Sequence, residues 1–454
     1  MIELLCRFMP LSCLLRGLLE RCFSPSRLDN LFARHAEEQY TRNLLFSTVC
    51  ELLLQVVLRV HPSMHAAYQA KQKEMNTSFV ALYDKLKGVE TGVSATLVSE
   101  TARDLAEIQD ALDVAPTPLL PGYSIRILDG NCLAASEKRL QVHQGLGSAP
   151  LPGKSLVVLD PQRRLLVNVF PCEDGHAQER SLLDQIIPTI QAGELWIEDR
   201  NFCTCGFLNG VHARGACVLV RQHGALPYQV LTAWSAPVVN AEGQTIREQW
   251  IDIQGRRYRR IRVELVKPTR DGDKHIDLIT DVPETVDAVT LADLYRNRWR
   301  LETAFQHLEA HLESEINTLA YPRAALLGFC LAVVAYNIFS LMLSAVDCAF
   351  EQPISETVST YYIGHEIAST FLALLLLTTA KDWQHLSECS AVEFAHWLRD
   401  IALAIDPSKY QKHSRGPKKP KPKTAYDPKH PHVSTYQLLL AKKKKLGKKE
   451  KQPP

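Results

Sequence analysis

Three carboxylates occupy positions from which their side chains could meet. Asp129 follows the apolar segment SIRIL, Asp199 follows LWIE, and Glu302 lies in the helical pattern LADLYRNRWRLETAFQHLEAHL. Strand ends in mixed α/β folds project side chains into a shared crevice, and a helix packed beside them can add a third ligand. Hard oxygen ligands of this kind suit Mg²⁺ or Mn²⁺. The sequence therefore predicts a metal site built from Asp129, Asp199 and Glu302.

Such a site suits phosphodiester chemistry. Two ions about 3.5–4 Å apart could activate the attacking oxygen and stabilise the leaving oxygen of a phosphodiester. Each carboxylate also has a simpler explanation when taken alone. Asp129-Gly130 is a common hairpin turn, Asp199 could be a helix N-cap, and Glu302 could be one more solvated helix charge.

The helical segment that carries Glu302 adds a ring and a guanidinium. Tyr295, Arg298 and Glu302 are spaced three and four residues apart, so they fall on one face of a helix. Arg298 could grip a phosphate bidentately beside the metal ligand. The alternative is an ordinary Arg–Glu pair one helical turn apart that only stabilises the helix.

These segments resemble those of a known family. YRNRWRLETAF resembles the Tyr-x2-Arg-x3-Glu signature of insertion-sequence transposases of the IS-four group, with ILDGN as the first Asp motif and WIEDRNF as the second. The resemblance spans roughly residues 120–345. It implies an α/β fold with an RNase H-like mixed-sheet core, in which Asp129, Asp199 and Glu302 form a DDE triad that binds two Mg²⁺ or Mn²⁺ ions.

The resemblance also implies an activity and its partners. It implies metal-dependent endonuclease cleavage at transposon ends, which frees 3′ hydroxyls that attack target DNA. The partners would be double-stranded DNA, both terminal inverted repeats and target, and a second copy of the chain in a synaptic homodimer. The chain departs from the family pattern at one position, since Glu309 stands where a Lys is expected seven residues after Glu302.

Two other classes of function remain open. Glu309 favours a catalytically decayed, DNA-binding remnant of a transposase. An integral membrane protein is the other alternative, because residues 324–346 carry no charge and residues 367–380 are largely apolar. We favour a core helix for residues 324–346, since Asn337 interrupts them and no aromatic belt flanks them.

A basic, aromatic segment between Asp199 and Glu302 could contact DNA. Basic residues interleaved with an aromatic ring suit backbone contact plus base stacking, although a charged hairpin edge is an equally good explanation. In similar transposases an aromatic residue here stabilises a flipped base, for which Trp234 and Trp250 are candidates. The predicted DNA-binding residues are Arg200, Trp250, Arg256, Arg257, Tyr258, Arg259, Arg260, Tyr295 and Arg298.

The pattern of the chain predicts four regions. Residues 1–118 read as a helical domain for DNA-end recognition, and residues 119–345 as the catalytic domain with a β-rich insertion at about 222–288. C-terminal helices follow at 346–406. Residues 407–454 read as a basic, disordered tail, apart from a short helix near 436–445.

Composition supports a folded intracellular protein with an uneven charge. Apolar residues make up 46% of the 454, near the globular average. The net charge of +2 combines +13 in residues 407–454 with −11 in the rest. The 12 cysteines have no regular spacing, which indicates thiols of a reducing compartment, and Cys203-x-Cys205 lacks a second pair for zinc. With no convincing signal peptide, we expect a cytoplasmic, nucleoid-associated protein without a membrane anchor.

Overall fold

The structure is a computed structural model, and it describes residues 2–39, 44–73, 75, 77–113, 118–133, 136–269, 272–413 and 432–449. The side chains of residues 309–311 and 446–449 lie outside this description, so Glu309 is placed in its helix without its side chain.

The first part of the chain is helical, as the sequence predicts. Its longest helix, α7, packs against strand β4 (Leu165–Cys172) of the central sheet and against helix α12 (Pro322–Phe350). The helices are α1 (Ile2–Phe8), α2 (Pro10–Phe23), α3 (Pro25–His35), α4 (Phe46–Val57), α5 (Met64–Lys71), α6 (Phe79–Gly88) and α7 (Thr91–Ala111).

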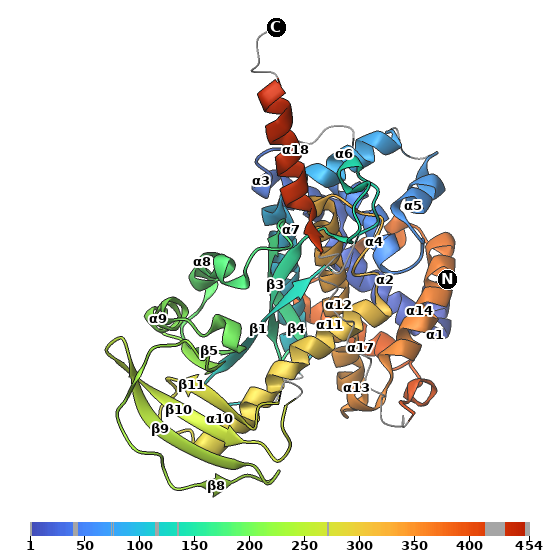
Figure 1. Cartoon of the computed structure of the whole chain (residues 1–454). Coiled ribbons are helices and arrows are strands. Elements are labelled where there is room, and N and C mark those ends of the chain that lie inside the picture. The colour runs from blue at the N-terminus through green and yellow to red at the C-terminus, as the bar shows by residue number, and fades with distance from the viewer. Residues whose placement is uncertain are drawn as a thin grey trace.

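A single mixed sheet of ten strands forms the middle of the molecule (Figure 1). β1 runs parallel to β5 and antiparallel to β3, and β5 runs parallel to β6. The order across the sheet is β4 (Leu165–Cys172), β3 (Lys154–Asp160), β1 (Ser124–Cys132), β5 (Glu194–Glu198), β6 (Cys217–Arg221), β11 (His275–Thr280), β10 (Arg256–Glu264), β9 (Thr245–Ile253) and β7 (Gln229–Val230), with β8 (Val238–Val239) also on β9.

The β-rich insertion extends this sheet rather than forming a separate one. β11 pairs antiparallel with β6, and β10 and β9 form a hairpin around Gly255. Gly255 has a φ of +82°, which glycine adopts without the steric cost of a β-carbon. The fold class predicted from the sequence, a mixed α/β core with a β-rich insertion between helical ends, is confirmed.

Short helices and turns connect the strands, and η4 (Arg200–Phe202) directly follows the end of β5 and packs against η2 (Glu179–Leu182). After β4 the chain forms three consecutive short helical turns, and a further turn follows β5. They are η2 (Glu179–Leu182), α8 (Leu183–Ile186), η3 (Ile187–Thr189), η4 (Arg200–Phe202) and α9 (Cys205–Ala213), and the β1–β3 connection holds η1 (Gln141–His143) and β2 (Pro150–Leu151).

The helices after the insertion pack on one face of the sheet. The helical segment that carries Glu302 is divided by one 3-10 turn into α10 (Ala288–Tyr295), η5 (Arg296–Arg298) and α11 (Trp299–His311). The others are α12 (Pro322–Phe350), α13 (Ile354–Thr357), α14 (Thr360–Leu377), α15 (Ala380–Trp383), α16 (His385–Glu388), α17 (Ala391–Ala402) and η6 (Pro407–Tyr410).

Within the described residues, two helices, α12 and α14, are long and apolar enough to cross a membrane by length and composition. In α12, however, 83% of the most apolar stretch is buried inside the protein, against α4, α7, α17 and β4. Asn337, fully buried, donates to the Leu166 carbonyl and accepts from the Leu166 amide at 2.9 and 2.7 Å. The prediction of a core helix at residues 324–346 is confirmed. α14 is only 22% buried over its most apolar stretch.

The last described segment of the chain returns to the domain that contains the sheet. β12 (Val433–Ser434) pairs parallel with β2, and α18 (Thr435–Lys449) follows it. Figure 1 shows α18 projecting away from the body of the molecule. The short helix expected near 436–445 is present as α18. The expectation of a disordered tail is wrong for residues 407–413 and 433–435, where Tyr410, Ser434 and Thr435 are buried, while residues 414–431 and 450–454 lie outside the described residues.

Candidate active site at the ends of β1 and β5

Strand alternation places Asp129 and Asp199 on the same face of the sheet. Ile125 and Ile127 of β1, and Leu195 and Ile197 of β5, belong to the core shared with the helices. Side chains two residues apart point to the same face of a strand, so Asp129 and Asp199 continue these two rows. The parallel register pairs Leu128 with Glu198, which sets the two aspartates side by side one residue further on.

The 3-10 turn η5 brings Arg298 and Glu302 over this face. Leu301, Ala304 and Leu308 bury the inner side of α11 in the same core, and α11 packs against β1. Arg298 Nη1 donates to Asp129 Oδ2 at 3.1 Å, and Arg298 Nη2 contacts Glu302 Oε1 at 2.9 Å. One guanidinium therefore bridges two members of the predicted triad.

Asp199 belongs to the same group of charges. It precedes η4, and its side chain makes no capping hydrogen bond, so the simple N-cap explanation does not hold. Burial alone would lower the Arg298 pKa, but nearby groups raise it above its ordinary value: Tyr295, Asp129, Asp199 and Glu302. Tyr295 is buried in the same place, and its hydroxyl donates to the Glu198 carbonyl at 3.2 Å.

The surroundings of Asp129 shift the pKa of its carboxyl. Burial raises the pKa of Asp129 to about 6, although the Gly130 amide and Arg298 both lower it; the charges of Glu302 and Glu179 add to the rise. The Gly130 amide donates to Asp129 Oδ1 at 2.8 Å. A buried carboxyl surrounded by other carboxyls is a frequent feature of functional sites.

The donor chemistry fits a hard divalent cation, although the side chains are not arranged around one. Asp129, Asp199 and Glu302 offer carboxylate oxygens, and the like charges among them are relieved by the cation of Arg298. In the described part of the chain, no three His, Cys, Asp or Glu side chains lie close enough to hold an ion. The guanidinium of Arg298 stands among the carboxylates, so ion binding requires these side chains to move.

The predicted DNA-binding residues fall into two groups. Arg200 and Arg257 are exposed, whereas Trp250, Arg256 and Arg260 are partly buried. Arg257 stacks on Trp250 with 4.8 Å between the guanidinium carbon and the ring centre. Trp250 Nε1 donates to Glu284 Oε1 at 2.8 Å.

Tyr258 and Arg259 lie in the core, so the prediction that they contact DNA needs correction. Each is only 1% exposed. Arg259 pairs with Glu248 at 2.7 Å and donates to the carbonyls of Val282, Pro283 and Val286. An arginine with this set of partners fixes the base of α10 to the insertion and has no surface to offer to DNA.

Sequence reasoning missed Glu179, which belongs to the surroundings of Asp129. It stands at the start of η2, in a stretch whose composition resembles any amphipathic helix. Only the packing of η2 near the strand ends reveals the position of Glu179.

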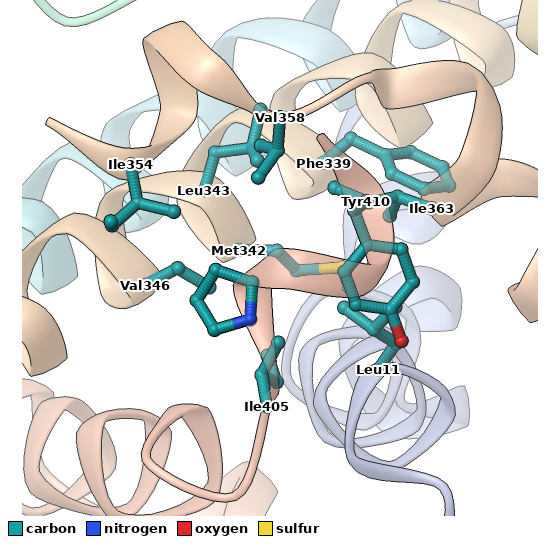
Figure 2. A pocket seen from close by; sticks show the side chains of 11 residues that line it. Leu11, Phe339, Met342, Leu343, Val346, Ile354, Val358, Ile363, Ile405 and Tyr410 are labelled. Carbon is teal, nitrogen blue, oxygen red and sulfur yellow. The ribbon is translucent and has the colours of Figure 1, made fainter. Parts of the chain in front are cut away.

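A small apolar cavity of about 10 Å³ lies between α2, α12 and η6 (Figure 2). Its lining includes Phe339, Met342 and Tyr410 and contains no carboxylate, so it is separate from the candidate site.

Comparison with known protein families identifies the domain that contains these carboxylates. Residues 121–338 match the family model of the transposase DDE domain. Residues 121–338 are a transposase DDE domain. A comparison with curated proteins gave no match. Among solved structures, the chain is similar to the piggyBac transposase in its synaptic complex with hairpin DNA, with 11% identity, a TM-score of 0.37, and coverage of 87% of this chain and 85% of that one.

The DDE domain contains the sheet and the three predicted carboxylates. Its matched range begins just before β1 and ends within α12, so it takes in Asp129, Asp199, Glu302 and the insertion. The assignment to the IS-four group stays a prediction from the signature around Tyr295, Arg298 and Glu302.

Proposed function

We propose that the chain is a DDE transposase that cleaves DNA at the ends of a mobile element and transfers the freed ends to target DNA. The observation that supports this most is the bridging of Asp129 and Glu302 by Arg298, with Asp199 beside them, inside the DDE domain. In this proposal water attacks the phosphorus of one phosphodiester and a 3′ hydroxyl leaves. That hydroxyl then attacks a target phosphodiester, so one P–O bond forms for each one broken.

Asp129, Asp199 and Glu302 would hold the metal ions. Mg²⁺ or Mn²⁺, when bound, would supply Lewis-acid stabilisation of the attacking and leaving oxygens. The carboxylates would hold these ions at the ends of β1 and β5, where partial burial weakens the screening of their charges by water. Arg298 is the residue that we expect to grip a non-bridging phosphate oxygen once its contact with Asp129 is released.

DNA would be held by cations that the fold leaves exposed. Arg200 lies next to Asp199, Arg257 projects from the insertion, and Lys442–Lys445 surround one turn of α18. The N-terminal helices would recognise the terminal inverted repeats, and a homodimer would pair two DNA ends. This partner set follows the resemblance stated from the sequence.

The test is cleavage of a labelled duplex carrying the element's terminal repeats, with Mg²⁺ or Mn²⁺. We expect nicking at the repeat ends by the wild type, and loss of nicking in Asp199→Asn and in Glu302→Gln. Glu107→Gln is the matched control, because Glu107 is exposed on α7 and should cut as the wild type does. If the wild type binds the repeats but leaves them intact in either metal, the decayed DNA-binding remnant becomes the better assignment.

A further inference from the structure

A second cavity, larger than the apolar one beside α2, lies between the N-terminal helices and the DDE domain. Its volume is about 530 Å³, within the size range of sites that hold a small organic group. Residues of α5 and α6 line it on the N-terminal side, and residues of the β1–β3 connection and of the segment between α11 and α12 line it on the DDE side. We call it the ring-lined cavity, after Phe79, Tyr83 and Tyr321.

Aromatic rings from both sides give the ring-lined cavity flat apolar surfaces. The centre of the Phe79 ring lies 4.6 Å from that of His65 and 4.7 Å from that of Tyr83, edge-on in both cases. Tyr321 adds a ring from the DDE side, and the Lys87 ammonium lies 5.7 Å from its centre. Tyr83 and Tyr321 are only partly buried, so part of each ring is accessible. Planar ligands stack on such rings, and every nucleobase offers a planar face.

Polar groups in the same cavity are left without a protein partner. The Thr318 hydroxyl is buried and forms no hydrogen bond within the described residues. Arg139 donates from Nε to Glu137 Oε2 at 2.6 Å, and its two Nη groups form no hydrogen bond in the described part of the chain. Burial raises the Tyr83 pKa and the charge of Arg139 acts in the opposite direction, so the guanidinium lies close to this ring. These groups match the polar edge of a base and the oxygens of a phosphate.

The charges around the ring-lined cavity favour an anionic ligand. Among the described residues, no carboxylate lines it. The Arg139–Glu137 pair is about half exposed, and Lys87 pairs with Asp84 at 2.6 Å, also near the surface. Exposed ion pairs contribute little, so phosphate groups can compete for both cations.

The DDE side of the cavity is continuous with the candidate active site. β1, whose end carries Asp129, leads into the connection that holds Arg139, and α11 leads from the carboxylates into the segment 312–321. The Glu137 amide donates to the Asn317 carbonyl at 2.8 Å and ties these two segments together. α11 has 13 residues and spans about 20 Å, which matches about six nucleotides of a duplex strand at about 3.4 Å each. A DNA strand that lies on the carboxylates can therefore reach the cavity.

We propose that the ring-lined cavity binds one unpaired nucleobase of the DNA strand on which the active site acts. Tyr83 and Tyr321 stack on the base, Thr318 bonds with its edge, and Arg139 and Lys87 hold the neighbouring phosphates. The inference rests on the proposed function, since that function supplies the DNA. None of these residues belongs to the β-rich insertion.

The experiment measures binding of the full chain to two duplexes of one random sequence, without metal, so that no strand is cut. One duplex is fully paired, and the other carries a single 2-aminopurine opposite an abasic site. The wild type should bind the second duplex at least about fivefold more tightly, the lower end for one base stacked on a ring, and should quench the 2-aminopurine fluorescence. Tyr83→Leu and Tyr321→Leu should lose this preference and bind the paired duplex as the wild type does. Tyr361→Leu, 53% exposed on α14, is the matched control and should keep the preference.

Two further measurements separate stacking from a general effect on folding. Tyr83→Phe keeps the ring and should keep the preference, whereas Arg139→Gln, an exposed change, should reduce it. A duplex with an unpaired 5-iodouracil should cross-link under light to the peptide that contains Tyr83 or to the one that contains Tyr321.

The outcomes distinguish this inference from the proposed function. If the wild type binds both duplexes equally, the inference fails, whatever the chain does to the terminal repeats. It fails also if the preference survives both leucine variants or if the cross-link lies outside the cavity. If free deoxyadenosine monophosphate binds with the same dependence on Tyr83 and Tyr321 while the unpaired base adds nothing, the cavity is a site for free nucleotides and not for a DNA strand. A preference that holds in a chain that never nicks the repeats would sink the proposed cleavage alone.

Discussion

Two segments of the molecule are strongly basic: the arginines of the insertion and the lysines of α18. They differ in the side chains that surround them. On β10, Arg260 and Arg262 share the carboxylate of Asp277 at 2.6 and 2.8 Å. Burial alone would raise the Asp277 pKa, but these two arginines hold it below its ordinary value. On α18, Lys442–Lys445 are all exposed, and none forms an ion pair within the described residues.

The difference teaches that the number of basic residues does not predict how much charge DNA would meet. On adjacent strands, side chains of one face stand opposite one another, so an arginine row recruits acids from the neighbouring strand. Tyr228 and Trp234 then cover Arg260 at 5.1 and 5.2 Å. On α18, which projects from the body of the molecule, Lys442 Nζ donates to Gln141 Oε1 at 2.9 Å, and no carboxylate pairs with Lys442–Lys445 within the described residues. At about 100° per residue, four consecutive lysines spread around most of the circumference of a helix.

The largest effect should come from Arg259, the most deeply buried cation of the insertion. Arg259→Gln leaves Glu248 and the carbonyls of Val282, Pro283 and Val286 without their donor. Breaking a buried pair in this way costs about 3–5 kcal/mol of unfolding free energy. Urea unfolding measures it, and Arg257→Gln, two residues away and exposed, is the control at about 0–1 kcal/mol. Equal losses in the two variants would contradict the contrast between the segments.

The next effect concerns DNA affinity and should fall on α18. Replacing Lys442–Lys445 together by Gln should leave the unfolding free energy unchanged, because these side chains are exposed. The slope of log Kobs against log salt for a random duplex should become less steep by up to about 3.6, at about 0.9 per phosphate contact. The comparison variant Arg260→Gln with Arg262→Gln should lower stability and leave the slope unchanged. The reverse result would place the DNA surface on the insertion.

The same contrast shows what sequence alone could predict. The segments SIRIL and LWIE predicted the strands β1 and β5 and placed Asp129 and Asp199 at their ends, and the β-rich pattern at about 222–288 predicted the insertion. The burial of Arg259 and the position of Glu179 could not be predicted, since both depend on contacts between segments distant in the sequence. The docking of β12 on β2 was missed for a similar reason, because two residues carry no periodicity.

A smaller, pH-dependent effect should appear at the carboxylates. Because the Asp129 pKa is raised to about 6, its proton competes with a divalent ion below that pH. Mn²⁺ affinity should be constant well above pH 6 and should fall by about tenfold per pH unit below it. In Arg298→Gln the midpoint should shift to higher pH, since Arg298 is one of the groups that lower this pKa. A midpoint that stays near 4 in the wild type would show that Asp129 is not the group that titrates.

The smallest effect should come from the anchor of α18. Thr435 is fully buried, and its hydroxyl lies 3.3 Å from Nε2 of His143, which is also buried. Thr435→Arg should release α18, because an unpaired buried charge is not tolerated there. All four lysines remain, so the salt slope for a random duplex should stay unchanged, while chymotrypsin should cut faster at Tyr436 and the leucines that follow. Thr435→Ser keeps the hydroxyl and should behave as the wild type. If the slope fell in Thr435→Arg as far as in the lysine variant, the lysines would act only when docked, and the DNA surface would include the domain beneath them.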